Sequence, residues 1–127
     1  RERWIMDSCK EIGLSEKTLD LIKQGMVGAC SPGGTAWPLF NFSVKYEHSP
    51  ESTPAKNIQL ACKTGTAETG KKDENGKIKT HAWLTGYAPV DDPEIVVTVL
   101  VEEGGEGSDV AAPIVKEILE EWFSNKQ

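Results

Sequence analysis

Apolar and polar residues follow two different periods along the chain, and these periods predict three strands and two helices. Short apolar runs bounded by turn residues predict strands at 58–66, 80–88 and 94–102. Apolar side chains at helical spacing predict an N-terminal helix over 16–28 and a strongly amphipathic C-terminal helix over 109–124. Consecutive strands joined by short turns pair antiparallel. We therefore expect an α+β fold in which an antiparallel sheet of about three strands is covered by both helices.

Turn and capping residues separate these elements. Ser15 is placed to cap the N-terminal helix, and Ser108 to cap the C-terminal one. The run Asp73-Glu74-Asn75-Gly76 predicts a hairpin between the first two strands, because Asn-Gly readily forms a tight turn. Residues 35–54 mix aromatic and polar residues without a clear period, so we expect a loop there. Trp83 and Trp122 are expected to pack between the sheet and the final helix.

Composition restricts the classes of function. A chain of 127 residues suits one domain, and we take 1–127 as a single unit. The net charge of −6 speaks against nucleic-acid binding, which needs clustered Lys and Arg. No apolar run approaches the roughly 18 residues of a membrane span. The chain starts at Arg1 rather than Met, so we expect a processed product or a fragment.

The three cysteines give little information at this stage. Cys9, Cys30 and Cys62 have no metal-ligand spacing, and their odd number leaves at least one unpaired within the chain. Cys62 lies in an apolar run and is expected to be a small core residue. A disulfide between Cys9 and Cys30 is compatible with the sequence but has no positive support. We expect no metal and no cofactor.

The candidate chemistry lies in Lys63-Thr64-Gly65-Thr66-Ala67, at the end of the first predicted strand. A cation attracts a substrate carboxylate, hydroxyl groups orient it, and a glycine lets the substrate lie flat against the strand. A Lys-Thr-Gly triplet on a strand end is typical of serine acyl-transferases that react with penicillin. Three common residues also recur by chance, so the triplet alone favours a strand that ends in a polar turn, with Lys63 facing solvent.

The other half of such an active site is missing. These enzymes need a nucleophilic serine followed three residues later by lysine, and none of the serines here has lysine at that position. The pattern Ser-x-Asn is also absent. We therefore expect this chain to carry only part of a catalytic centre.

Other readings of the polar residues are weaker. Residues 65–71 match the spacing of a phosphate-binding P-loop, but its last position is Lys72 instead of Ser or Thr. A hairpin rather than a helix is predicted to follow, so both observations disfavour nucleotide binding. His48 and His81 have no partner at a recognisable spacing and are expected to be surface or packing residues. The acidic residues between 102 and 109 predict a solvated loop rather than a calcium site.

Several ordered pieces together resemble the C-terminal part of the transpeptidase domain of class B penicillin-binding proteins. The pieces cover about four-fifths of the chain, in the same order and spacing as in that family. They are Leu21–Val27, Gly34-Thr35-Ala36, Cys62–Glu68, His81–Pro89, the strand 96–101, Gly104-Gly105 and the final helix. In that family the Ser-x-x-Lys and Ser-x-Asn motifs lie upstream of these pieces, so the chain resembles the trailing portion of a bisected catalytic domain.

The resemblance implies a role for each residue of the motif. Lys63 would supply positive potential for the carboxylate of a stem peptide or a β-lactam, and Thr64, Gly65 and Thr66 would bind the substrate. The backbone N–H of Thr66 would be one of two oxyanion-hole donors, worth about 3 kcal/mol of barrier. The catalytic residues expected here are thus Lys63 and Thr66. Strand alternation adds that Lys63 points away from the side that Thr64 and Thr66 share.

The family also implies partners and a location. The expected function is the substrate-binding and β-lactam-binding half of a peptidoglycan D,D-transpeptidase that cross-links stem peptides. Its partners would be the stem peptide or β-lactam and the upstream portion of the same protein. The fragment would self-associate, and the whole protein would act at the extracytoplasmic face of the bacterial inner membrane. The alternatives are a scaffold module with a vestigial motif and a fragment of a β-lactamase-like hydrolase.

Overall fold

The structure is a computed structural model that describes residues 13–46 and 48–125. In chain order the elements are α1 (Glu16–Ala29), the 3-10 turn η1 (Trp37–Leu39), β1 (Ser43–Val44), β2 (Lys56–Asn57), β3 (Ala61–Lys72), β4 (Ile78–Ala88), β5 (Ile95–Val101), the π-helical turn η2 (Gly107–Ala111) and α2 (Ala112–Ser124). β3, β4 and β5 form an antiparallel sheet in that order, and β1 pairs with β2 in a separate small sheet. The predicted α+β fold with three antiparallel strands is confirmed.

The first strand runs further along the chain than predicted. It starts at Ala61 rather than at 58 and continues to Lys72 instead of 66. Its polar second half pairs with β4, where Glu68 lies opposite Thr80 and an irregularity precedes the pair of Lys72 with Ile78. Polar residues that pair along a long hairpin carry no apolar signal in the sequence, which is why the prediction stops too early.

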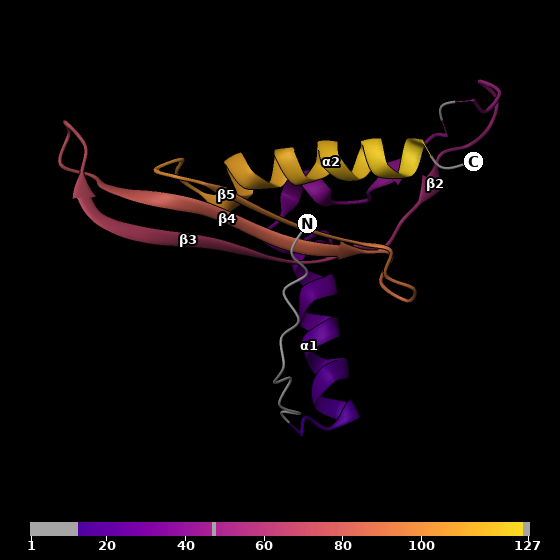
Figure 1. Cartoon of the computed structure of the whole chain (residues 1–127), viewed down its shortest axis with the longest axis horizontal. Coiled ribbons are helices and arrows are strands. Elements are labelled where there is room, and N and C mark those ends of the chain that lie inside the picture. The colour runs from indigo at the N-terminus through magenta and orange to yellow at the C-terminus, as the bar shows by residue number, and fades with distance from the viewer. Residues whose placement is uncertain (1–12, 47, 126–127) are drawn as a thin grey trace, which may run out of the picture.

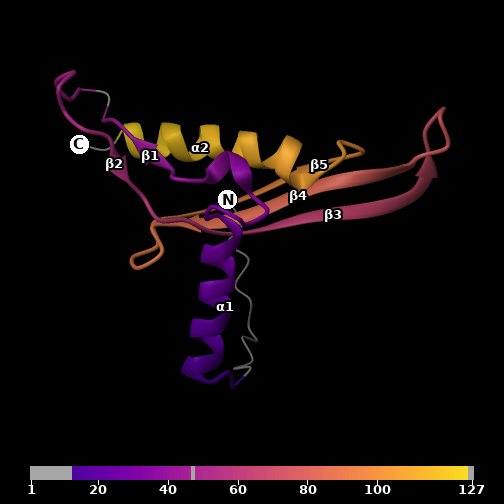
Figure 2. The same cartoon turned by 180° about the vertical axis from the view of Figure 1, so that it is seen from behind.

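One face of the sheet packs against α2, as Figures 1 and 2 show. β4 turns alternate residues toward this face, including Leu84, which is fully buried. α2 packs against this face with a stripe of buried residues at helical spacing. The stripe consists of Ala112, Val115, Leu119 and Phe123. The segment before β3 closes the core, because Leu39, Phe42 and Val44 are buried in the same cluster. The region predicted as a loop therefore contributes a 3-10 turn, a short strand and core side chains.

Much of the opposite face of the sheet is exposed in the described part of the chain, although Ala61, at the start of β3, is buried. Trp83 is 39% exposed, Leu100 is 43% exposed and Val96 is 72% exposed. The prediction that Trp83 packs under the final helix is wrong, because its neighbours Ala82 and Leu84 are the buried residues of β4 and alternation turns Trp83 away from α2.

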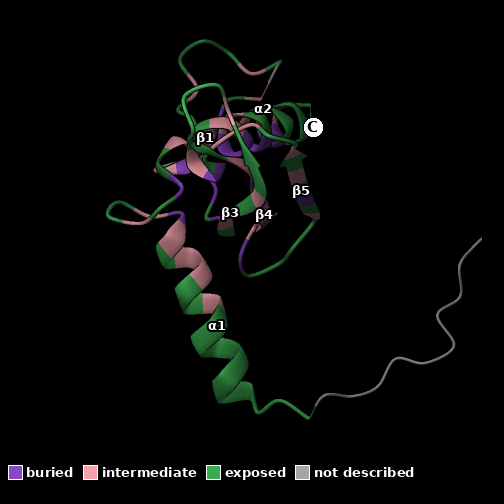
Figure 3. Cartoon of the chain, turned by 90° about the vertical axis from the view of Figure 1, so that its left-hand side faces the viewer, coloured by how far each residue is buried: buried purple, intermediate pink, exposed green. Residues whose placement is uncertain are grey.

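The N-terminal helix α1 does not cover the sheet as expected. It extends away from the sheet on the side opposite α2 (Figures 1 and 3), and none of its residues is buried. Ser15 caps it as predicted, accepting a hydrogen bond from the backbone N–H of Thr18 at 3.2 Å. Leu19, Leu21 and Ile22 remain at least half exposed. Helical periodicity predicts an apolar face but does not predict which surface that face will meet. Neither described helix has the length and apolar character needed to cross a bilayer.

A disulfide joins the end of α1 to the start of β3. Cys30, just after α1, is bonded to Cys62, with 5.9 Å between their Cα atoms. Both residues are buried, at 5% and 1% exposure. Cys62 is thus the core residue that the sequence predicts, but with a covalent partner that the sequence did not identify. Cys9 lies outside the described residues, and its suggested pairing with Cys30 is not the one found.

A cluster of charges fastens the β3–β4 hairpin to the loop after β5. The Glu103 carboxylate accepts from the Lys71 ammonium at 3.0 Å and from the Lys79 ammonium at 2.6 Å. Hydrogen bonds from the ammonium groups of Lys79 and Lys71 lower the pKa of Glu103 from 4.5 to about 2. The hydrogen bond with Glu103 in turn raises the pKa of Lys79. The Glu103 N–H also donates to Nδ1 of His81 at 3.0 Å, so the imidazole of this partly exposed histidine has a structural contact. The hairpin turns at Gly76, whose φ is 81°.

We expect the disulfide to stabilise the chain through its loop of 32 residues. In a Cys9→Ala background, replacing both Cys30 and Cys62 by Ala should lower the free energy of unfolding by about 3 kcal/mol in urea denaturation. Reduction of the Cys9→Ala chain, which keeps both side chains, should shift the urea midpoint in the same direction. An unchanged midpoint after reduction would contradict the bond.

The Glu103 cluster should give stability that depends on pH. Because the folded pKa is lowered, the stabilisation is complete above the ordinary pKa of 4.5 and is lost as pH falls toward about 2. Glu103→Gln should remove this part of the pH dependence, whereas the neighbouring Glu102→Gln should preserve it. A carboxyl ¹³C titration that places Glu103 at an unshifted pKa would show that the ion pairs do not form.

The open sheet face and the unpaired strand edges should cause self-association of the isolated chain. Light scattering is expected to show dimers or larger species that dissociate on dilution. Val96→Lys, which puts a charge on the exposed face of β5, should shift the population toward monomer. A monodisperse monomer for the unmodified chain would refute this expectation.

Candidate functional site

The Lys63–Thr66 segment lies on the outer strand of the sheet. β3 pairs with β4 on one side only, and no strand among the described residues pairs with its other edge. Half of the backbone N–H and C=O groups of an edge strand point away from its partner and remain available to an extended peptide. β3 continues into the Asp73–Gly76 hairpin rather than into a helix, which removes the P-loop reading. The motif is therefore an open ribbon edge.

Strand alternation places the motif side chains on two faces. Lys63 lies opposite Thr85, and Gly65 opposite Trp83, on the face that α2 leaves open. Thr64 and Thr66 share the other face, as predicted. The Lys63 ammonium is exposed and donates to the backbone carbonyl of Thr64, so it folds back along the strand edge. The motif therefore presents a cation on one face of the edge and two hydroxyl groups on the other.

Thr64 is held by the turn that follows α1. Its hydroxyl and that of Thr35 are 2.9 Å apart and share a hydrogen bond. The turn sits tightly on the end of α1, because a Cβ at Gly34 would lie 2.5 Å from the carbonyl oxygen of Ala29. The N–H of Ala36 donates to that same carbonyl at 2.9 Å. The hydrogen bond between Thr35 and Thr64 and the Cys30–Cys62 disulfide together connect the turn after α1 to the motif.

Thr66 is held by the loop between β5 and η2. Its hydroxyl donates to the Glu106 carboxylate at 2.8 Å, and the N–H of Gly107 approaches the same hydroxyl oxygen at 3.5 Å. Gly107 lies directly on the strands, since a Cβ there would clash with the Trp83 carbonyl and lie 2.5 Å from the Gly65 carbonyl. Only glycine fits this approach, which explains the glycine at the first position of η2. Ser108 does not cap α2 as predicted, and its hydroxyl donates to Asp109 instead.

The structure thus brings together the predicted residues of the motif and adds three that sequence reasoning missed. Thr35 was noted only as part of a family-like piece, Glu106 was assigned to a solvated loop, and Gly107 was not singled out. Their hydrogen bonds or contacts span 29 to 41 positions of the sequence, so no local pattern could reveal them. Chemically, the site can hold an anion near Lys63 and an extended peptide along the edge of β3.

Comparison with known proteins agrees with this geometry. The family described as "Penicillin binding protein transpeptidase domain" matches residues 7–120. The peptidoglycan D,D-transpeptidase MrdA of Haemophilus influenzae is 38% identical over 79 residues, which make up 55% of this chain and 12% of that protein. The chain therefore spans about an eighth of the length of this relative.

Solved structures show the same fold. The penicillin-binding protein PBP2 of Helicobacter pylori is similar with a TM-score of 0.58 and 29% identity, over 87% of this chain and 18% of that one. Penicillin-binding protein A of M. tuberculosis, solved as an imipenem acyl-enzyme complex, gives a TM-score of 0.56 and 28% identity, over 87% of this chain and 20% of that one. From the match over residues 7–120 and from this shared fold, we conclude that the chain belongs to the penicillin-binding protein transpeptidase family.

Proposed function

We propose that this chain is the C-terminal part of a peptidoglycan D,D-transpeptidase and supplies its substrate-binding strand. The open edge of β3, with Lys63 on one face and Thr66 on the other, is the observation that carries the proposal. The terminal carboxylate of a stem peptide would lie in the positive potential of Lys63 and accept from the Thr66 hydroxyl, and the peptide backbone would pair with β3 as an added antiparallel strand. A β-lactam carboxylate would take the same place.

The reaction itself needs residues that this chain does not contain. In the complete enzyme a serine hydroxyl attacks the carbonyl of D-Ala-D-Ala, forms an acyl-enzyme ester and releases D-alanine. The acyl group then passes to an amine of a second stem peptide, which restores the serine. The N–H of Thr66 would stabilise the oxyanion in both steps together with a donor from the upstream part. Alone, the chain should bind but not react.

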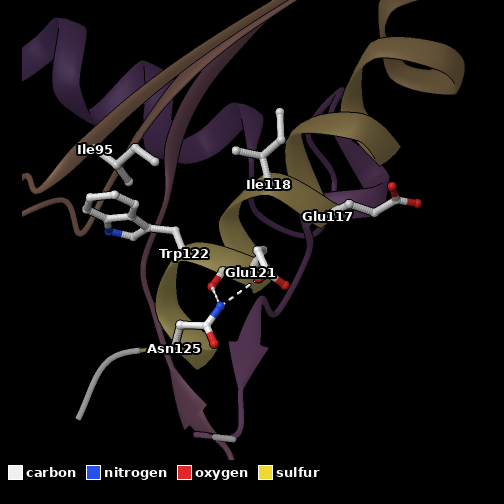
Figure 4. Close-up of a pocket in the computed structure, with 6 residues that line it drawn as sticks. All are labelled: Ile95, Glu117, Ile118, Glu121, Trp122 and Asn125. Atoms are coloured by element: carbon white, nitrogen blue, oxygen red, sulfur yellow. Dashed lines mark hydrogen bonds between the residues drawn. The ribbon is translucent and has the colours of Figure 1, made fainter.

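The upstream part of the protein is the proposed partner of the open surfaces. A cavity of about 790 Å³ lies beside the outer strand β5, lined by Ile95, Ile118 and Trp122 together with three polar residues of α2 and its end. Figure 4 shows the Trp122 ring beside Ile95. Trp122 is 43% exposed. It therefore lies at the edge of the contact between α2 and the sheet and is not buried within it. We infer that upstream chain covers this cavity and the open sheet face, and that the assembled enzyme works at the extracytoplasmic face of the inner membrane.

The test is complementation with labelled penicillin. This chain alone should form no covalent adduct, whereas a mixture with the upstream fragment that carries Ser-x-x-Lys and Ser-x-Asn should be labelled on the upstream serine. Lys63→Ala should slow this acylation by about tenfold to a hundredfold, because a charge-assisted contact with the ligand carboxylate is lost.

Lys77→Ala is the matched control, since Lys77 is an exposed lysine in the hairpin connection before β4 and should leave the acylation rate unchanged. If light scattering shows that the two fragments assemble and no penicillin adduct forms, the functional assignment fails. Equal rates for Lys63→Ala and Lys77→Ala would remove Lys63 from the site.

A further inference from the structure

The hydroxyl of Thr66 is already occupied by a carboxylate of the protein itself. Thr66 Oγ1 donates to Glu106 Oε2 at 2.8 Å, across 40 positions of the sequence. A hydroxyl group has a single proton to donate. While this bond is formed, Thr66 presents only lone pairs to a ligand that approaches the edge of β3.

Glu106 is held in place by the backbone on both sides of it. Before it, the N–H of Gly105 donates to the Thr80 carbonyl at 3.1 Å, and the Thr80 hydroxyl donates to the Gly105 carbonyl at 3.0 Å. After it, Gly107 packs directly on the backbone of Gly65. These two anchors fix the backbone of Glu106 beside β3, within reach of the Thr66 hydroxyl.

We propose that Glu106 is a specificity-determining residue that competes with the ligand carboxylate for Thr66. This inference rests on the function proposed above. A peptide or β-lactam carboxylate that reaches Thr66 must displace the Glu106 carboxylate from the hydroxyl and approach a like charge. Glu106 thereby weakens the binding of carboxylate-terminated ligands, and ligands without that charge are not penalised.

The experiment is an NMR titration of the intact 127-residue chain with N-acetylated D-Ala-D-Ala and with the C-terminal amide of the same peptide. Glu106→Gln should tighten binding of the free-acid peptide by about threefold to tenfold, because like charges across a binding surface oppose association. Binding of the amide peptide should not change. Glu102→Gln removes the same charge from an exposed position of the same loop and should have no effect on either peptide.

A double-mutant cycle shows whether Glu106 acts through Thr66. In a Thr66→Val background, Glu106→Gln should bring a clearly smaller gain for the free-acid peptide, since the contested hydroxyl is absent and only the repulsion between like charges is relieved. If Glu106→Gln tightens binding by the same factor in that background, the effect comes from the net charge of the protein and not from Thr66. That result would overturn the proposal. So would an equal gain from Glu102→Gln.

The outcomes separate this inference from the function on which it rests. If the free-acid peptide binds, Lys63→Ala abolishes its binding and Glu106→Gln leaves affinity unchanged or weaker, the competition at Thr66 is wrong while the carboxylate site stands. If the free-acid peptide binds neither the unmodified chain nor the Glu106→Gln variant, the carboxylate site and the competition both fall.

Discussion

The one-sided pairing of β3 with β4 is the constraint on which the rest of this structure depends. β4 uses one edge of β3, and the other edge stays open over the Lys63–Thr66 segment. Because side chains alternate across a strand, this edge has a cation on one face and hydroxyl groups on the other. A strand in the middle of the sheet would have the same residues but no free backbone to pair with a peptide.

The open edge is surrounded by segments that come from far along the chain. The turn after α1 contacts Thr64 through Thr35, and the disulfide holds that turn beside the strand. The loop after β5 crosses the sheet and contacts Thr66 through Glu106. Both contacts lie on the face that packs toward α2, whereas Lys63 lies on the face that α2 leaves open. The two faces of the motif therefore have different surroundings: Thr64 and Thr66 have hydrogen-bond partners from distant segments, whereas Lys63 lies on the face away from α2.

The sequence predicts the parts of this arrangement that depend on local order. Alternation and turn residues indicate the three strands, the hairpin at Gly76 and the stripe of α2, because these signals come from neighbouring residues. The motif itself is visible for the same reason. The polar second half of β3 is missed, since cross-strand pairing rather than apolar character keeps it extended.

Features that depend on distant contacts could not be predicted. The partner of Cys62 is a matter of tertiary geometry, and three cysteines allow several pairings. The direction of α1 depends on the surface against which its apolar face packs, and helical periodicity does not identify that surface. Glu106 looks like any acid in a glycine-rich loop until Gly107 is seen to rest on Gly65.

The most direct test of the account is the position of a bound peptide on the chain. Intermolecular NOEs between N-acetylated D-Ala-D-Ala and the ¹⁵N-labelled protein should run in antiparallel order along residues 63–66, with the methyl group of the C-terminal D-alanine near the Lys63 side chain. NOEs confined to the cavity beside Ile95 and Trp122, or spread over the open sheet face, would contradict the claim that the edge of β3 binds the substrate.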